Sequence, residues 1–143
     1  ALLFISRMAS ILVIDDNLDL ARAVVKRLER SGHSAVIAVD GNAGLALFRS
    51  QRIDLILTDI LMPEKEGLET IRELRKENPD VPIIAMSGGG YATGTDYLRL
   101  AMKFGANASL QKPFEQHELV ALVTELLGGL HSGPSTPGAP TNR

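Results

Sequence analysis

The chain has 143 residues, 45% of them hydrophobic and 22% charged, which is ordinary for one globular domain with a core of its own. Its formal net charge is −2, without a basic block, which argues against a nucleic acid or an anionic membrane surface as partner. It has no cysteine, so disulfides, thiolate catalysis and cysteine metal sites are excluded, and a reducing cytosol is compatible with the composition.

Short apolar runs alternate with segments of helical periodicity along the chain. Strands are predicted at residues 11–14, 35–39, 55–59, 81–86 and 108–111. Five helices are predicted between and after them: one that begins after Asn17 and stops at Ser31-Gly32, one at 41–51, one that begins near Leu68 and ends before Asn78, one at about 96–104, and one that ends at Gly128-Gly129.

This alternation indicates the fold class. Helical connections between apolar strands imply a parallel sheet covered by helices on both faces. Because such crossovers are right-handed, the prediction is an α/β fold with a doubly wound five-stranded parallel sheet.

The ends of the chain differ from this pattern. We predict an N-terminal extension at residues 1–9, in which the segment before Met8 is a non-native addition, a domain at 10–128 and a disordered Gly/Pro/Ser-rich tail at 129–143. The apolar start is too short to span a membrane and lacks the features of a signal peptide. A cytoplasmic location is therefore expected. Because the tail is too short and too polar to fold, a chain that is complete as given would be a single-domain protein without an output domain.

Polar side chains stand where four of the predicted strands end. They are Asp15 and Asp16 after the first strand, Asp59 at the third, Ser87 after the fourth and Lys112 after the fifth. Each one alone reads as a capping, turn or surface residue. Because the carboxyl ends of parallel strands meet at one edge of the sheet, where such folds bind ligands, their joint occurrence predicts a functional site.

The residue types suggest the chemistry of that site. Three clustered carboxylates repel one another, and the single charge of Lys112 leaves the cluster negative. Oxygen ligands in a hydrated cleft favour Mg²⁺ or a similar hard cation such as Mn²⁺. Asp59 could then attack a phosphoryl donor, while the metal, Ser87 and Lys112 neutralise the phosphoryl oxygens.

The chain resembles the receiver domain of bacterial two-component response regulators over about residues 10–127. The resemblance implies a flavodoxin-like sheet of strand order 2-1-3-4-5. It rests on four motifs: Asp15-Asp16 after the first strand, Asp59-x-x-Met62-Pro63-x-x-x-Gly67, Ser87 after the fourth strand, and Lys112-Pro113-Phe114 after the fifth.

The resemblance also implies residue roles. Asp59 would be the phospho-acceptor, and Asp15, Asp16, Asp59 and the backbone carbonyl of Leu61 would hold Mg²⁺. Ser87 and Lys112 would bind the phosphoryl group, and the Lys112–Pro113 peptide is usually cis in this family. The donor would be a histidine kinase or a histidine phosphotransfer protein. The domain would catalyse only its own phosphorylation and dephosphorylation, and it would signal through a downstream protein or by passing the phosphoryl group onward.

Two positions depart from the family pattern. Ser109 stands three residues before Lys112, where the family commonly has an aromatic side chain or His that swings inward with the hydroxyl residue. Ser87 is followed by three glycines, which make the next loop unusually free. We therefore predict that Ser87 and this loop, rather than a ring at Ser109, carry the conformational response, and that the loop orders on phosphorylation.

Three other interpretations compete with this one, and the first two fall well behind it. An aspartyl-phosphate phosphatase of the haloacid dehalogenase kind needs a second aspartate where this chain has Leu61. A flavin-binding module of flavodoxin type needs a Ser/Thr/Gly-rich phosphate loop where Asp15 and Asp16 stand. A receiver-like interaction module that is never phosphorylated is the third, and the complete set of acceptor residues argues against it.

Overall fold

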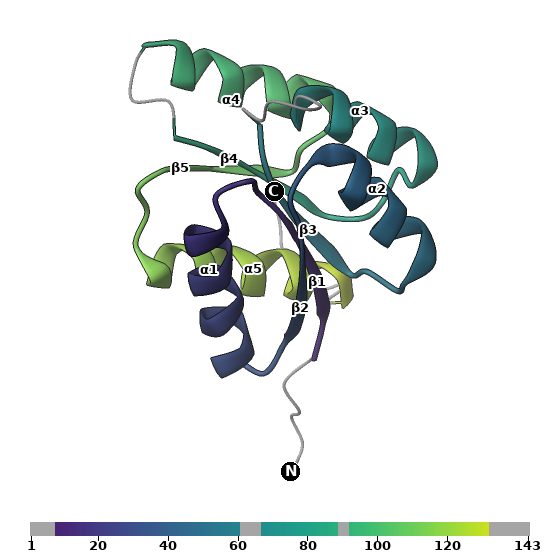
Figure 1. The fold of residues 1–143 in the computed structure, drawn as a ribbon, viewed down its shortest axis with the longest axis vertical. Helices are drawn as coiled ribbons and strands as arrows, with labels where there is room; N and C mark the ends of the chain where they lie inside the picture. The colour runs from purple at the N-terminus through teal and green to yellow at the C-terminus, as the bar shows by residue number, and fades with distance from the viewer. Residues whose placement is uncertain (1–7, 61–66, 89–91, 132–143) are drawn as a thin grey trace.

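A computed structural model describes residues 8–60, 67–88 and 92–131 of the chain (Figure 1). Five strands and five helices alternate in it. The strands are β1 (Ser10–Ile14), β2 (Ser34–Ala38), β3 (Leu55–Asp59), β4 (Ile83–Ser87) and β5 (Ala108–Gln111). The helices are α1 (Leu18–Arg30), α2 (Gly41–Ser50), α3 (Gly67–Glu77), α4 (Ala92–Phe104) and α5 (Gln116–His131).

All strand pairs are parallel, and the sheet has the order β2-β1-β3-β4-β5. Helices α2, α3 and α4 cover one face of the sheet, and α1 and α5 cover the other (Figure 1). The predicted doubly wound α/β fold and its strand order are confirmed.

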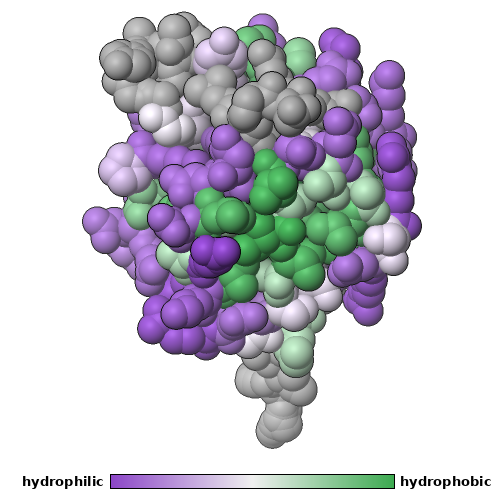
Figure 2. Space-filling view, viewed as in Figure 1, coloured by the Kyte–Doolittle hydropathy of each residue, from purple (hydrophilic) through white to green (hydrophobic). Residues whose placement is uncertain are grey.

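The core is divided by the sheet into two apolar layers. Successive residues of a strand point to opposite faces, so Leu12 and Ile56 pack under α2 and α3, while Val13 and Leu57 pack under α1 and α5. The three central strands are buried along nearly their whole length, as continuous apolar runs require. The outer strand β2 is only half-buried, and Figure 2 shows apolar side chains near this edge surrounded by hydrophilic ones.

Two predicted helix boundaries are wrong. Helix α4 begins at Ala92, four residues before the expected start, although Thr and Gly are weak helix formers. Helix α5 continues through Gly128 to His131. Among the described glycines only Gly32 and Gly105 have positive φ, so Gly128 does not adopt the left-handed conformation that ends a helix.

Residues 1–7 and 132–143 lie outside the described residues, so the predictions for these segments stay predictions. Residues 129–131, which the prediction placed in the disordered tail, belong to α5. In the part of the chain that the structure describes, no helix combines the length and the apolar character that crossing a membrane requires.

Candidate functional site

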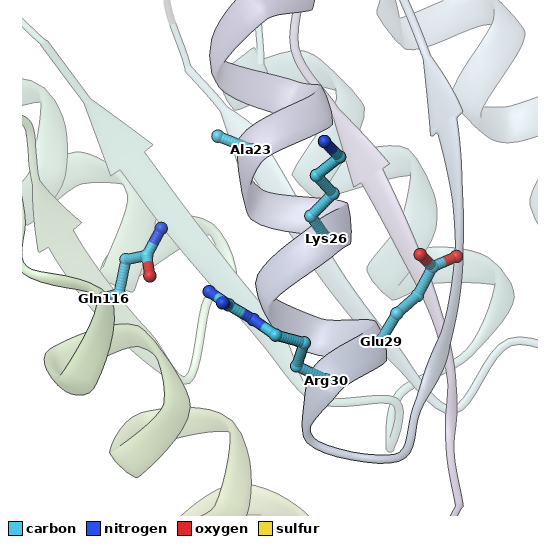
Figure 3. Close-up of a pocket in the computed structure, with 5 residues that line it drawn as sticks. All are labelled: Ala23, Lys26, Glu29, Arg30 and Gln116. Atoms are coloured by element: carbon cyan, nitrogen blue, oxygen red, sulfur yellow. The ribbon is translucent and has the colours of Figure 1, made fainter.

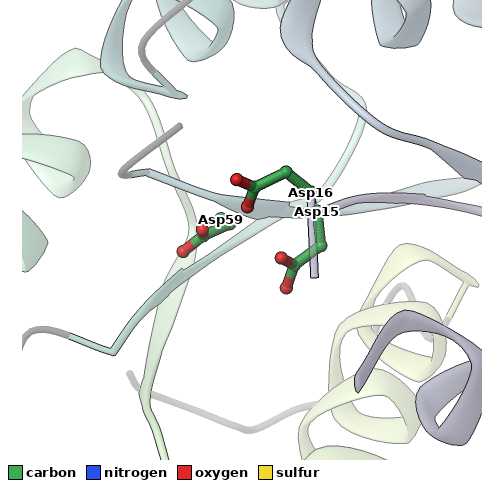
Figure 4. A group of neighbouring side chains, drawn as sticks. All are labelled: Asp15, Asp16 and Asp59. Carbon is green, nitrogen blue, oxygen red and sulfur yellow. The ribbon is translucent and has the colours of Figure 1, made fainter. Parts of the chain in front are cut away.

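Three carboxylates meet beyond the ends of β1 and β3 (Figure 4). Asp15 and Asp16 follow the last residue of β1, and Asp59 is the last residue of β3. One oxygen of each lies within 4.8 Å of the others. Asp15 and Asp59 are buried, at 1% and 5% exposure, whereas Asp16 is exposed. Such a group of oxygen donors, two buried and one open to water, could hold a hard metal ion.

Lys112 enters this cluster from the end of β5. Its Nζ donates a hydrogen bond to Oδ2 of Asp15 at 2.8 Å and lies 3.6 Å from Oδ1 of Asp59. The Lys112–Pro113 peptide is cis, as the resemblance implied. One cation among three carboxylates leaves the site with a net charge of −2, and the sequence-based expectation of a negative cluster around Lys112 is therefore met.

The environment of Asp59 disfavours its charged form. Burial raises the pKa of this carboxyl to about 6 from an ordinary 3.8, and the neighbouring Asp15 and Asp16 act in the same direction, while Lys112 opposes them. A bound divalent cation would favour the ionised form of this carboxyl group.

The raised pKa of Asp59 predicts a pH-dependent stability. The folded state holds the proton more tightly than the unfolded state, so stability is lost as the pH rises from about 4 through about 6. Asp59→Asn, which is neutral at every pH, should therefore raise the unfolding free energy at about pH 8 without Mg²⁺. The full shift corresponds to about 3 kcal/mol, and solvent screening reduces the expected gain to about 1–2 kcal/mol.

Urea unfolding of both proteins at about pH 4 and about pH 8 measures this gain. At the lower pH the difference should nearly vanish, and at the higher pH added Mg²⁺ should reduce it by stabilising the parent. An equal difference at both pH values would show that the charge of Asp59 does not cause it.

Backbone contacts join Ser87 and Lys112. Ser87 is the last residue of β4 and is fully buried, and the Lys112 N–H donates to the Ser87 carbonyl at 2.8 Å. Asp59 is in register with Met86, the residue before Ser87. Ser87, Lys112 and Asp59 are therefore brought to one edge of the sheet, as the sequence predicted.

Gly67 approaches the backbone of Asp59. It is the first residue of α3, and its N–H donates to the Ile60 carbonyl at 3.2 Å. A Cβ atom on Gly67 would lie under 3.0 Å from the Asp59 carbonyl oxygen and from the Ile60 Cα. The sequence motif included Gly67, but the reason for it is this backbone contact, which no residue pattern shows.

Asp15 has structural contacts that the sequence reasoning missed. Its Oδ1 accepts a hydrogen bond from the Asn17 N–H at 2.9 Å, and its Oδ2 accepts the bond from Lys112. The Asn17 side chain in turn caps α1 by accepting from the Leu20 N–H at 3.2 Å. The Asp-Asp-Asn sequence can therefore both cap α1 and supply carboxylates to the site: Asn17 is the cap, and Asp15 and Asp16 belong to the cluster.

Two further predicted positions have different outcomes. Ser109 lies on β5 opposite Ala85, and its side chain is exposed. As a serine it has no ring that could move between an exposed and a buried position. Leu61, whose carbonyl was predicted as a metal ligand, lies outside the described residues, as do Gly89 and Gly90 of the loop after Ser87.

Two surface grooves lie near α1. One opens beside the site and is lined by Asn17, Leu20, Gly88, Lys112, Pro113 and Phe114. The other runs between α1 and the start of α5 and is lined by Ala23, Lys26, Glu29, Arg30 and Gln116 (Figure 3). Lys112 lines the first groove and no site residue lines the second, so the first groove is the one that borders the site.

The fold and the site together define a class: a doubly wound α/β domain with an aspartate cluster, a hydroxyl residue and a lysine at the carboxyl edge of its sheet. The family model described as response regulator receiver domain matches residues 11–124. The chain therefore belongs to the response regulator receiver family, whose members act in two-component signalling.

Relatives support this membership. The transcriptional regulatory protein CpxR of Klebsiella pneumoniae is 35% identical over 125 residues, covering 87% of this chain and 51% of that protein. The response regulator MprA of Mycolicibacterium vanbaalenii is 36% identical over 118 residues, covering 82% and 49%. The chain thus spans about half the length of these curated relatives.

Solved structures agree with the fold. A response regulator receiver domain from Clostridium thermocellum superposes with a TM-score of 0.79 at 31% identity, covering 86% of this chain and 97% of that one. The receiver domain of the Francisella response regulator 1452 gives 0.76 at 29% identity, covering 85% and 98%.

Proposed function

We propose that this receiver domain accepts a phosphoryl group on Asp59 in a Mg²⁺-dependent reaction, with Mn²⁺ as a substitute metal. The observation that carries the proposal is a buried carboxylate, Asp59, set between two further carboxylates and a lysine. The donor would be a histidine kinase or a histidine phosphotransfer protein, and the domain would catalyse only its own phosphorylation and dephosphorylation.

In this reaction an Oδ atom of Asp59 attacks the phosphorus of a phosphohistidine. The P–N bond breaks as the new O–P bond forms, and the electron pair leaves with the imidazole nitrogen. Asp15, Asp16, Asp59 and the Leu61 carbonyl would hold the metal, which supplies charge neutralisation. Lys112 Nζ would exchange its carboxylate contacts for a phosphoryl oxygen.

The hydroxyl of Ser87 would donate to a second phosphoryl oxygen. Because Ser87 is joined to Lys112 through the backbone, the two groups would respond to the phosphoryl group together. With Ser109 exposed and without a ring, the response would be transmitted by the segment after Ser87. It would change the start of α4 and the surface formed by α4, β5 and α5, to which a downstream protein would bind. We place this signalling in the cytoplasm.

Nucleic-acid binding is not proposed for this chain. CpxR is a transcriptional regulator by name, yet the matched region is about half of its length, and the domain's charge is balanced. A receiver-like module that is never phosphorylated is the main alternative, and direct labelling decides between the two.

Intact-mass measurement after incubation with acetyl phosphate and Mg²⁺ tests the proposal. We expect one phosphoryl adduct, which is absent with EDTA and absent in Asp59→Asn. Asp80→Asn, which removes an exposed carboxylate after α3, is the matched control and should label like the parent. Equal labelling without metal, or in Asp59→Asn, would overturn the assignment of Asp59, and a complete lack of adduct would favour the interaction module.

A further inference from the structure

One arginine near the end of α3 joins three segments of the chain. The guanidinium of Arg75 donates from Nη1 to the carbonyls of Asn78 and Val81, at 3.1 and 2.7 Å. Its Nε and Nη2 donate to the Gly105 carbonyl at 3.1 and 2.6 Å, and Nη2 also donates to Oδ1 of Asn107 at 2.9 Å. All five N–H donors of a guanidinium can thus be used at once, which only arginine permits.

These contacts fasten the C-terminal end of α4 to the start of β4. Asn107 Oδ1 accepts from the Ile83 N–H at 2.8 Å, and the Asn107 N–H donates to the Ile83 carbonyl at 2.8 Å. Gly105, with φ of +127°, lies so close that a Cβ there would meet Arg75 Cγ at 3.0 Å. One turn earlier on α3, the Arg72 guanidinium lies 5.1 Å from the centre of the Phe104 ring.

The described side chains of α4, residues 97–104, also pack against the apolar core. Of its described side chains, Ala101 is fully buried, while Tyr97, Leu98 and Phe104 pack only partly against the core. An alanine contributes little contact area and no side-chain interdigitation that would fix the tilt of a helix. For the part of α4 whose side chains are described, residues 97–104, the densest set of hydrogen bonds therefore lies just beyond its C-terminal end.

The other end of α4 is adjacent to the acceptor site. Helix α4 begins at Ala92, five residues after Ser87 at the end of β4. The contacts of Arg75 lie at the opposite end of β4, where this strand begins. A 13-residue helix is about 18 Å long, so a tilt of about 10° about its C-terminal end moves the first turn by about 3 Å and the last turn by less than about 1 Å.

We propose that Arg75 makes the C-terminal end of α4 a fixed pivot, so that phosphorylation of Asp59 tilts this helix from its N-terminal end. The proposal rests on the proposed function of Asp59, and it adds the direction of the response. The fork of hydrogen bonds from Arg75 holds Gly105 and Asn107 in place while the segment after Ser87 rearranges. Surface residues at the start of α4 then change position most, and those near Gly105 least.

Backbone NMR of the full chain, with Mg²⁺ and with or without beryllofluoride as the phosphoryl mimic, tests the pivot. In the parent, amide shift changes at residues 92–97 should exceed those at residues 105–107 by about threefold, following the displacements expected for a tilt. In Arg75→Gln the changes at 105–107 should rise until the difference is lost. Arg75→Lys, which keeps the charge but not the fork, should behave like Arg75→Gln, and Lys76→Gln on the exposed face of α3 should behave like the parent.

Each outcome decides a separate point. Equal changes along α4 in the parent, with clear responses at Ser87 and Lys112, would overturn the pivot and leave the proposed function standing. A gradient that persists in both Arg75 variants would overturn the role of Arg75. If Ser87 and Lys112 do not respond to beryllofluoride at all, the proposed function fails and the pivot with it. The parent measurement remains decisive if a variant does not fold, which thermal unfolding reveals.

Discussion

Gly67→Ala is expected to destabilise the domain by about 2–4 kcal/mol, because the added methyl group would overlap backbone atoms of Asp59 and Ile60. A side chain can rotate away from such a clash, but the Asp59 carbonyl oxygen at the end of β3 and the Ile60 Cα directly after it move only if the strand or α3 shifts. Because Asp59 lies on the affected segment, we also expect phosphorylation by acetyl phosphate to slow by about 10- to 100-fold.

The same substitution at Gly128 is the matched control. Gly128 lies within α5, and a Cβ there would meet nothing within 4 Å. Gly128→Ala should therefore stabilise the protein by about 0.5–1 kcal/mol, the usual gain from alanine inside a helix. Denaturant unfolding and intact-mass labelling of both variants give the comparison. A Gly67→Ala protein as stable and as reactive as the parent would show that the close backbone approach does not position Asp59.

The location of the site could be predicted because it depends on topology. Parallel strands joined by helices place their carboxyl ends at one edge, so residues after four strands had to meet there once the alternation was recognised. Asp15, Asp59 and Lys112 do meet within hydrogen-bonding or ion-pair distance. The apolar runs of the central strands predicted their burial for the same reason, since helices on both faces of the sheet cover both faces of its central strands.

Contacts that depend on tertiary packing could not be predicted. Arg75 stands in a polar stretch at the end of a helix, where an arginine is usually solvated, yet its donors bind carbonyls from segments up to 30 residues away. Helix α5 passes Gly128 because a helical glycine costs only about 1 kcal/mol, which the packing of Val123 and Leu127 against the core offsets. Local preferences are too small to decide such cases.

Arg75 and Lys112 stabilise opposite ends of the sheet by different means. Arg75 binds carbonyl and amide oxygens rather than a buried carboxylate, so we expect its contacts to depend little on the charge of the site. Lys112 is held by Asp15 and Asp59. A cation that enters the site therefore competes with Lys112 for these carboxylates, and a phosphoryl group competes with the carboxylates for Lys112. Lys112 is therefore the cation whose removal should change both stability and ligand binding.

Lys112→Met is expected to destabilise the domain by about 2–4 kcal/mol at about pH 8 without Mg²⁺, because it leaves two buried carboxylates without their cation. Methionine retains most of the apolar stem, so the change isolates the charge. The loss should shrink at about pH 5. Lys112 normally lowers the pKa of Asp59, so without it this carboxyl takes up a proton more readily and the remaining repulsion disappears.

Mg²⁺ should reverse the effect of Lys112→Met, since a divalent cation can replace the missing charge. Removing the ammonium group also removes its repulsion of the metal, so Mg²⁺ should bind about five- to tenfold more tightly than in the parent. Asp16→Asn supplies the contrast: it removes an exposed carboxylate from the cluster, and it should weaken Mg²⁺ binding without a comparable loss of stability. Titration calorimetry and urea unfolding at both pH values measure these effects. If Lys112→Met weakens Mg²⁺ binding as much as Asp16→Asn does, the lysine supports the architecture of the site rather than balancing its charge.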